Sequence, residues 1–340
     1  IVFFPLLLLA LEHLMVENRR GFFLIMVTIC AVSNYFFFAG MVVFLFLYYI
    51  LRVLSGDWKV TTSKFFQVAH ESILGVGLGA VILLPSALMV LQNNRVGSYP
   101  LGWGGILYSR NQIPAYIFQC FFFPPELPAR PSFFTSADVK WSSVAGWLPV
   151  FSMVGVIGWL QAKKGTWLRR IICILAFMAF IPILNSAFYA FNYAYYARWF
   201  YMPILMMVLA TCKGLEDEQI NWSSAFKWTA GITLAIILVV GFFPTSLSGE
   251  LSLDDFGLYD KNLAELFWVT CAIAVAGLIV MFVLLQLRKK STQVFTRTAI
   301  MSVCVLSVLY AAFFVGSGKT YGYNTKHYII PSLLESDITL

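Results

Sequence analysis

Long apolar runs, separated by short polar segments, form the dominant pattern along the chain. A helix that crosses a bilayer needs about 20 consecutive apolar residues, and several of the runs approach or exceed that length. The pattern predicts membrane segments near residues 1–16, 22–33, 35–54, 66–91, 143–161, 168–184, 199–213, 225–243, 264–287 and 297–315. We therefore expect an all-α polytopic membrane protein, a bundle of about ten transmembrane helices.

One part of this pattern has two interpretations. Residues 21–51 carry no charge, and this stretch is too long for one comfortable crossing and too short for two ordinary ones. Two short helices that break near Ser33 and Asn34 keep Arg20 and Arg52 on the same face of the membrane, whereas one tilted helix separates them. The basic residues favour two helices, and a single long helix is the alternative.

Composition excludes an ordinary soluble domain. Hydrophobic residues make up 60% of the 340 residues and charged residues 11%, against roughly a quarter charged in soluble domains. The net charge of +7 does not indicate a nucleic-acid partner, because the basic residues lie in short loops between apolar runs. The chain begins inside an apolar run and stops where a polar segment starts, so we expect an internal fragment of a longer protein.

The basic residues also predict the orientation in the membrane. If the segments alternate sides from the first one, a single face collects fifteen of the 23 basic residues. These are Arg19, Arg20, Arg52, Lys59, Lys64, Lys163, Lys164, Arg169, Arg170, Lys213, Lys227, Arg288, Lys289, Lys290 and Arg297. By the positive-inside rule this face is cytoplasmic, and the longer loops are extracytoplasmic.

Three segments belong to the outer face. Loop 92–142 is the largest and is rich in Pro, Gly and aromatic residues, loop 244–262 is acidic, and the tail 316–340 shifts toward polar composition. We expect residues 1–315 to form the helical bundle and the tail to begin an extracytoplasmic segment. Within the large loop, Gln112–Phe123 has the pattern of a helix lying in the interface. A lid over a lipid-linked substrate and a plain packing loop both fit this pattern.

The stretch 185–203 holds the strongest candidate for function. Arg198 lies among aromatic residues at the expected outer mouth of a helix, with Asn185 and Asn192 upstream. A cation at such a boundary is costly to desolvate unless it snorkels or meets an anion. One interpretation is a phosphate clamp, in which the guanidinium forks onto phosphate oxygens while aromatic rings pack against sugars. The other is an interfacial aromatic belt, although belts usually place their cations on the cytoplasmic side.

Other ionisable residues near the membrane have a structural interpretation. His70 and Glu71 lie near the cytoplasmic edge, as do Glu12 and His13. Side chains in such positions reach the interface by snorkelling. We therefore interpret both pairs as snorkelling groups rather than as a site.

The chain contains two glycine motifs. We interpret the first as a helix-packing motif and the second as a chance resemblance to a P-loop. Gly75 and Gly79 have the small-xxx-small spacing that lets a neighbouring helix approach closely, and Pro85 bends or ends the same helix. The segment Gly316–Thr320 imitates the end of a P-loop, but the full pattern needs a glycine where Phe313 stands.

The sequence contains no metal-binding motif, and no cofactor is identified. The three histidines share no motif, and the six cysteines form no CxxC pair, so the cysteines are interpreted as small hydrophobic residues of the bundle. The acidic side chains of loop 244–262 leave a divalent cation open. They are Glu250, Asp254, Asp255 and Asp260.

Three stretches resemble the YfhO family of bacterial membrane proteins. They are Asn34–Gly40 running into Tyr48-Tyr49, Gly75–Pro85, and Asn185–Pro203 with its Tyr-Ala-Arg-Trp. The resemblance implies a GT-C type glycosyltransferase, a multi-helix bundle in the bacterial cytoplasmic membrane with its active site on the outer face. Such enzymes use a polyprenyl-phosphate sugar as donor and glycosylate envelope polymers such as lipoteichoic acid. The family's acidic outer-loop motif, an Asp followed shortly by Gln-Tyr, has no match in the chain, so no catalytic residue is assigned.

Residues and resemblance together predict sugar transfer at the outer leaflet. Arg198 matches the family's arginine at the outer start of a helix, and we expect it to bind the donor phosphate together with Arg95. The candidates for contact with the donor sugar are Asn185, Asn192, Tyr195 and Tyr196. The expected partners are the polyprenyl-phosphate sugar, an envelope polymer or glycolipid as acceptor, and the bilayer.

Two other classes of function are open at this stage. A transporter that moves a glycolipid or envelope polymer without bond chemistry needs polar groups through the bilayer midplane, where this chain is nearly all apolar. A scaffold for other envelope enzymes predicts that changes around Arg198 are silent.

Overall fold

The computed structural model describes residues 2–92, 101–108, 112–127, 130–134, 144–192, 197–245 and 256–321. The regular structure of these ranges is helical, with no strand among them. The α-helices are α1 (Phe4–Val16), α2 (Phe22–Ser33), α3 (Tyr35–Leu54), α4 (Thr62–Leu91), α5 (Gln112–Gln119), α6 (Val154–Ala162), α7 (Trp167–Phe180), α8 (Pro182–Ser186), α9 (Tyr201–Glu216), α10 (Trp222–Phe242), α11 (Ala264–Lys290) and α12 (Thr292–Tyr321). The 3-10 helices are η1 (Gly102–Gly105), η2 (Ala187–Tyr189), η3 (Arg198–Phe200) and η5 (Lys261–Leu263).

Several of these helices are long and apolar enough to cross a bilayer. Within the described ranges the candidate spans are Tyr35–Leu54, Thr62–Val90, Trp222–Phe242, Lys261–Lys290 and Thr292–Lys319. A sixth is added if Trp167–Phe180 and Pro182–Tyr189, which meet at a bend of 107°, form one broken span. The protein is therefore a multi-pass, all-helical membrane protein, and the expected count of ten spans is not confirmed.

Four of the ten predicted membrane segments are not among these candidate spans, for physical reasons. Helices α1 and α2 contain 13 and 12 residues. Helix α9 contains 16 residues, which at 1.5 Å per residue is about 24 Å, below the hydrocarbon thickness of about 30 Å. Residues 144–153, which the apolar pattern assigned to a helix, are irregular. In this segment Val150 and Ser152 take left-handed φ values of 65° and 45°, which a helix cannot contain.

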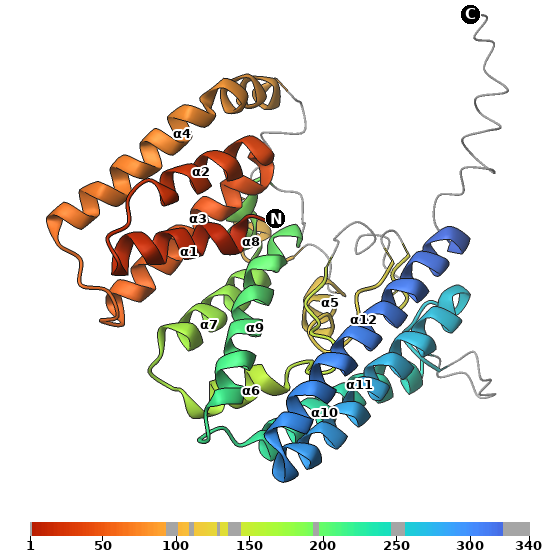
Figure 1. Cartoon of the computed structure of the whole chain (residues 1–340). Coiled ribbons are helices and arrows are strands. Elements are labelled where there is room, and N and C mark those ends of the chain that lie inside the picture. Colours follow the sequence, from red (N-terminus) through yellow and green to blue (C-terminus); the bar gives the residue numbers. More distant parts are fainter. Residues whose placement is uncertain are drawn as a thin grey trace, which may run out of the picture. The chain divides into compact units, whose positions relative to one another are not determined.

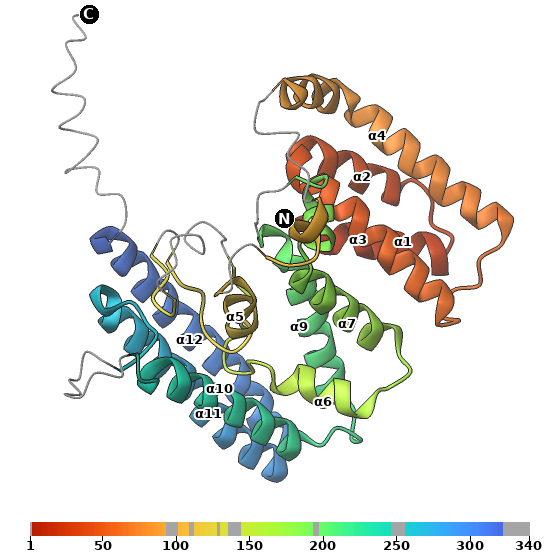
Figure 2. The same cartoon turned by 180° about the vertical axis from the view of Figure 1, so that it is seen from behind.

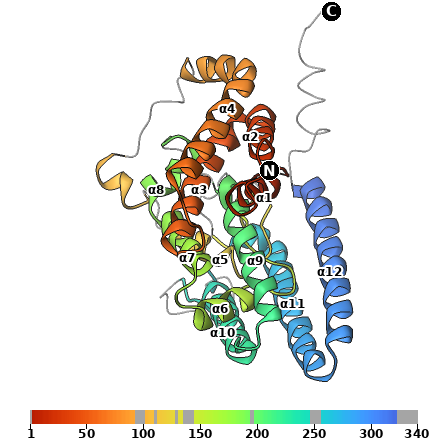
Figure 3. The ribbon, with the colours of Figure 1, turned by 60° about the vertical axis from the view of Figure 1, so that its left-hand side comes forward.

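The chain divides into two compact units, described separately. Unit 1 contains residues 1–109 and 163–209, and unit 2 contains residues 110–162 and 210–340. In unit 1, α2 packs along α4, and α1 and α3 lie against α2 (Figure 1). In unit 2, α10 packs against α6 and α11, and α11 packs along α12; the three long helices run alongside one another in Figures 2 and 3.

The break between α2 and α3 confirms the prediction of two helices. Ser33 ends α2 and Tyr35 begins α3. Between them Asn34 is extended, with φ −167°. Its side-chain Oδ1 accepts hydrogen bonds from the backbone N–H groups of Phe36 at 3.0 Å and Phe37 at 3.2 Å. Asn34 is thus an N-cap that supplies an acceptor to two otherwise unpaired donors.

The glycines of α4 confirm the predicted close packing. A Cβ on Gly75 would lie 2.8 Å from the Leu24 carbonyl oxygen and from Val27 of α2, and a Cβ on Gly79 would lie 3.1 Å from Ala31. Thr28 also donates a hydrogen bond to the Gly75 carbonyl at 3.0 Å. The backbones of α2 and α4 therefore approach each other because side chains are absent at these positions.

Glu71 does not snorkel, contrary to the expectation from its position. The residue is 6% exposed, and its carboxylate accepts hydrogen bonds from the backbone N–H groups of Gly21 at 2.9 Å and Leu24 at 3.1 Å. Glu71 therefore satisfies the amino terminus of α2 from a neighbouring helix, where a negative charge also complements the helix dipole. Its neighbour His70 is exposed.

Glu12 is likewise a paired group. Arg52 bonds the Glu12 carboxylate at 2.9 Å and Asp57 at 2.7 Å. The Arg52 guanidinium lies between two indoles, 5.0 Å from the Trp58 ring centroid and 4.9 Å from that of Trp167. Cation–π contact and two carboxylates compensate the charge of this cation, while its buried Nε–H has no hydrogen-bond partner among the described residues. The cluster ties the ends of α1, α3 and α7 together inside unit 1.

The two glycine environments of α4 generate a matched test of packing. Gly75→Ala is expected to lower the free energy of unfolding by about 1–3 kcal/mol, because the new methyl group overpacks against α2. Gly77→Ala is the control, since a Cβ at Gly77 meets nothing within 4 Å; alanine there gains helix propensity of up to about 1 kcal/mol. Unfolding titrations in detergent measure both, and equal effects would contradict the packing described here.

Candidate functional site

The arginine singled out by the sequence follows a sharp turn of the chain in unit 1. Helix α7 ends at Phe180 because Ile181 precedes a proline, which restricts it to an extended conformation (φ −112°, ψ 116°). Pro182 then begins α8 at the position where a proline costs no hydrogen bond. The chain bends by 107° between the two helices. Helix α8 and η2 carry it to the loop that precedes Arg198.

Asn185 is the centre of this turn. Its amide nitrogen donates to the Tyr108 hydroxyl at 2.9 Å and to the Ala179 carbonyl at 3.3 Å. Its amide oxygen accepts from the Tyr189 hydroxyl and from the Trp199 indole N–H, the latter at 3.1 Å. Asn185 is 1% exposed, and these four bonds use both hydrogens and both lone pairs of its side chain.

Tyr108 extends this network into loop 92–142. Its hydroxyl donates to the Ala179 carbonyl at 2.8 Å and accepts from Asn185. Burial raises the pKa of the Tyr108 hydroxyl above its usual range, so the group stays protonated and keeps its role as a donor. The end of α7 is therefore connected to the loop that follows α4 by side-chain hydrogen bonds.

Aromatic packing fixes the residue that follows Arg198. The Trp199 ring stacks on Phe188, with centroids 3.8 Å apart and planes 6° apart, and it meets Phe200 edge to face. Gly40 of α3 admits this cluster, since a Cβ there would lie 2.8 Å from the Phe188 carbonyl oxygen. Trp199 is 2% exposed and Phe200 1%. The backbone at the start of η3 is thus set by buried neighbours.

Arg198 itself is exposed. It is the first residue of η3, which leads directly into α9. A guanidinium on a rigid backbone beside the amino end of a helix presents planar donors together with the positive end of the helix dipole. This arrangement can bind a phosphate or a carboxylate through paired hydrogen bonds.

The other predicted site residues differ in burial and in whether the structure describes them. Asn192 lies three residues after η2 and is half-buried. Asn185 is buried under Trp199, so its contact with a sugar stays a prediction that requires its present bonds to open. Arg95, Tyr195 and Tyr196 lie outside the described residues.

The helix expected within loop 92–142 forms, in unit 2, over Gln112–Gln119 as α5, and its place in the membrane interface stays a prediction. It ends at Gln119 rather than at Phe123, and residues 120–123 form a turn. Phe123 is fully buried and packs edge to face against Phe133 at 4.9 Å. This part of the loop therefore packs into unit 2, and whether it also acts as a lid stays open.

Glu126 is a structural residue that the sequence analysis missed. Its Oε1 accepts hydrogen bonds from the Ser132 hydroxyl at 2.6 Å, the Ser132 backbone N–H and the Phe133 backbone N–H at 3.1 Å. Its Oε2 is buried and has no hydrogen-bond partner within the described ranges. Burial raises the pKa of the Glu126 carboxyl above its usual 4.5, while the hydrogen bonds from Ser132 oppose the rise. Glu126 and Ser132 lie six residues apart and form no sequence motif, so no sequence signal indicated this contact.

The acidic residues that leave a divalent cation open lie largely outside the described residues. Glu250, Asp254 and Asp255 lie in residues 246–255, which are not described, and Asp260 caps η5 through the Asn262 N–H at 2.9 Å. In the parts of the chain that are described, no three His, Cys, Asp or Glu side chains gather as metal ligands do.

The Asn185 network generates a prediction about order in the loop. Asn185→Ala removes the partners of the Tyr189 hydroxyl and the Trp199 indole, and we expect the free energy of unfolding to fall by about 3 kcal/mol. Hydrogen exchange should accelerate at residues 187–192 and 197–201. Asn192→Ala is the control and should change stability by less than about 0.5 kcal/mol; similar exchange in both variants would contradict the proposed role of Asn185.

The raised pKa of Glu126 generates a prediction about pH. Because the folded protein binds this proton more tightly than the unfolded chain does, the stabilising contribution is full below pH 4.5 and is lost as the pH rises through the raised pKa. Glu126→Gln, which stays neutral, should be more stable than the wild type above that pKa and should lose this part of the pH dependence. Thermal midpoints against pH measure it, with the exposed Glu265→Gln as control; a wild-type pH profile in Glu126→Gln would refute the assignment.

Comparisons with known proteins bear on nearly the whole chain. No curated protein and no solved structure has detectable similarity to it. The family model described as bacterial membrane protein YfhO matches residues 1–329. The match includes the helix break at Asn34, the glycines of α4 and the stretch around Asn185 and Arg198. The chain therefore belongs to the YfhO family of bacterial membrane proteins.

Proposed function

We propose that this protein transfers a sugar from a polyprenyl-phosphate donor to a cell-envelope acceptor, such as lipoteichoic acid, at the outer face of the bacterial membrane. Membership of the YfhO family supports a glycosyltransferase-like membrane protein. The observation that carries the proposal is the exposed Arg198, held at the start of α9 between a buried indole and a fully bonded asparagine turn.

The chemistry needs a stabilised leaving group. The acceptor hydroxyl attacks the anomeric carbon of the donor sugar, the bond between that carbon and the phosphate oxygen breaks, and the hydroxyl proton passes to a carboxylate base. Negative charge grows on the departing phosphate, where a positioned guanidinium lowers the barrier. Arg198 has this role in the proposal, assisted by Arg95, and the base is not assigned to a residue of this chain.

In this proposal, the rigid surroundings of Arg198 make its guanidinium effective in stabilising the departing phosphate. Trp199 is stacked on Phe188 and hydrogen-bonded to Asn185, so little reorganisation of the backbone accompanies the reaction. In this proposal Asn185 positions the loop, and Asn192, Tyr195 and Tyr196 are the groups that contact the sugar. A lysine at 198 would keep the charge but lose the planar fork.

One observation favours the rival function, a transporter for a glycolipid or envelope polymer. The bend of 107° between α7 and α8 is typical of the broken helices that form substrate sites in transporters. The same bend also places Asn185 under Trp199, as the glycosyltransferase proposal requires. The experiment therefore has to separate bond chemistry from movement between leaflets.

The test uses the full-length protein in proteoliposomes with a radiolabelled polyprenyl-phosphate sugar and a crude envelope-polymer acceptor. The wild type should move label to the polymer. Arg198→Ala should reduce the rate about 100-fold or more, as expected when a charge-stabilising donor is lost, and Arg198→Lys should recover only part of it. Arg170→Ala, an exposed arginine of α7 at the other end of the same unit, is the matched control.

Three results would redirect the proposal. Label that changes leaflet with the donor bond intact identifies a transporter. Full transfer by Arg198→Lys removes the bidentate clamp from the mechanism. Wild-type transfer by Arg198→Ala leaves no role for this cation in the donor site, as expected of a scaffold.

A further inference from the structure

A cavity in unit 2 lies at the ends of α10 and α11 that the basic residues predict to be cytoplasmic. Its volume is about 740 Å³, within the range of small-molecule sites. Its lining residues are Glu218, Gln219, Ile220, Asn221, Trp222, Ser223, Phe226, Lys227, Phe282, Leu285, Gln286, Arg288 and Lys289. The proposed donor site around Arg198 uses none of them.

The polar part of this lining is strongly cationic. Lys227, Arg288 and Lys289 face one acidic residue, Glu218. Among the described residues, no carboxylate forms an ion pair with Lys227 or Lys289. Both lysines are exposed, so they are available to an anion that enters the cavity.

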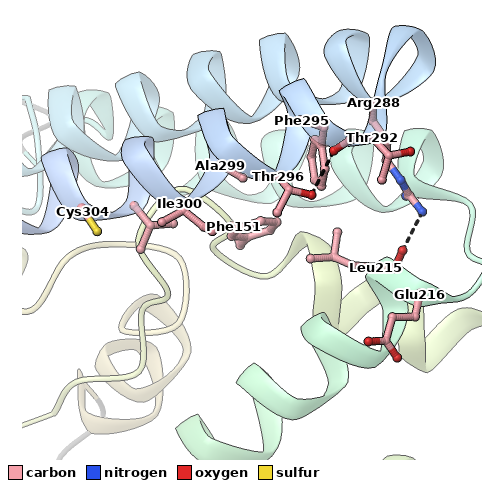
Figure 4. Close-up of a pocket in the computed structure, with 11 residues that line it drawn as sticks. Phe151, Leu215, Glu216, Arg288, Thr292, Phe295, Thr296, Ala299, Ile300 and Cys304 are labelled. Atoms are coloured by element: carbon pink, nitrogen blue, oxygen red, sulfur yellow. Dashed lines mark hydrogen bonds between the residues drawn. The ribbon is translucent and has the colours of Figure 1, made fainter.

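Arg288 is held in place at the wall. Its Nη2 donates to the Leu215 carbonyl at 3.1 Å, which is the bond drawn in Figure 4. Its guanidinium carbon lies 4.9 Å from the Trp222 ring centroid. Figure 4 also shows that Arg288 lines a second, largely apolar cavity of about 420 Å³ between α9 and α12. A guanidinium fixed on two sides is a pre-organised charge rather than a mobile surface group.

Trp222 supplies an independent sign of a ligand. It is 7% exposed, and its indole Nε1–H is buried without a hydrogen-bond partner among the described residues. Buried donors are nearly always paired, and an unpaired one costs about 1–3 kcal/mol. The donor lines the same cavity as the three cations, so an anionic acceptor would satisfy all four groups.

The other part of the lining is apolar and faces the bilayer region of the helices. Phe226 lies one turn beyond Trp222 in α10, and its ring is 5.9 Å from that of Phe282 in α11. Phe282 is 51% exposed. The cavity therefore has cations at the helix ends and aromatic rings further along the helices. This arrangement fits an amphiphile whose headgroup lies in the cavity and whose chains lie along Phe226 and Phe282.

We propose that this cavity binds an anionic phospholipid of the cytoplasmic leaflet. The phosphate contacts Lys227, Arg288 and Lys289 and accepts the hydrogen bond of the Trp222 indole, and the acyl chains lie against Phe226 and Phe282. Basic pockets between transmembrane helices on the cytoplasmic side have the chemistry that anionic headgroups require. The apolar extension favours a lipid over a free phosphate ester.

The test measures lipid binding to the purified protein by native mass spectrometry. Phosphatidylglycerol is expected to bind more tightly than phosphatidylcholine with the same acyl chains. Lys227→Gln combined with Lys289→Gln should weaken phosphatidylglycerol binding about 30-fold. Lys59→Gln combined with Lys164→Gln makes the same change in net charge on exposed lysines that do not line the cavity, and should weaken binding less than about twofold.

Trp222→Phe is the sharpest variant. It keeps an aromatic ring for Arg288 and removes the unpaired N–H together with part of the buried indole, so the thermal midpoint without lipid is measured alongside and should fall only by the packing loss. Phosphatidylglycerol binding should weaken about tenfold through loss of one charge-assisted hydrogen bond.

Each of three outcomes would overturn the proposal. Equal binding of the two lipids excludes an anion site. Wild-type affinity in both the double-lysine variant and Trp222→Phe places the lipid elsewhere. Competition by glycerol phosphate at the same concentration as phosphatidylglycerol assigns the cavity to a soluble phosphate ester.

Discussion

The structure depends on one constraint: in hydrocarbon, every polar group needs a partner inside the protein. The helices of unit 1 meet it at their ends. Glu71 of α4 accepts from the amino terminus of α2, Asn34 caps α3, and Asn185 satisfies the bend after α7. These three side chains supply hydrogen bonds to backbone groups that lack a helical partner where short apolar helices begin, end and turn. Without them, the same residues would favour fewer and longer helices.

The need for internal hydrogen-bond partners also explains why Asn185 and Arg198, the two candidate site residues near the bend, differ in burial. Asn185 is buried and has used all of its hydrogen-bonding capacity, while Arg198 is exposed on a backbone that Trp199 holds. In the proposed function, Asn185 therefore positions the loop while Arg198 contacts the donor phosphate. The division resembles that of other sites in which a buried polar network orients an exposed charged group.

Features of the fold that depend on residues close together in sequence were predictable. The break at Asn34 follows from the charge distribution, and the packing of Gly75 follows from its spacing to Gly79. Contacts between residues far apart in sequence were not predictable. Glu71 bonds the backbone 50 and 47 residues earlier, and Glu126 is fixed by a serine that shares no motif with it. Hydrophobicity also did not predict that Pro149 and the left-handed Val150 interrupt the apolar stretch 143–161.

Ala190 and Phe191 give the loop before Arg198 a further property. Both have left-handed φ values, 55° and 61°, and both are exposed, with Phe191 at 48%. A left-handed conformation costs a residue with a side chain roughly 1–2 kcal/mol, and neither residue recovers that cost through burial. Backbone hydrogen bonds hold the pair in place, from the Phe191 N–H to the Ser186 carbonyl at 2.8 Å and from the Asn192 N–H to the Tyr189 carbonyl at 3.2 Å. The chain beside Arg198 therefore keeps a costly backbone conformation only while these two hydrogen bonds stay closed.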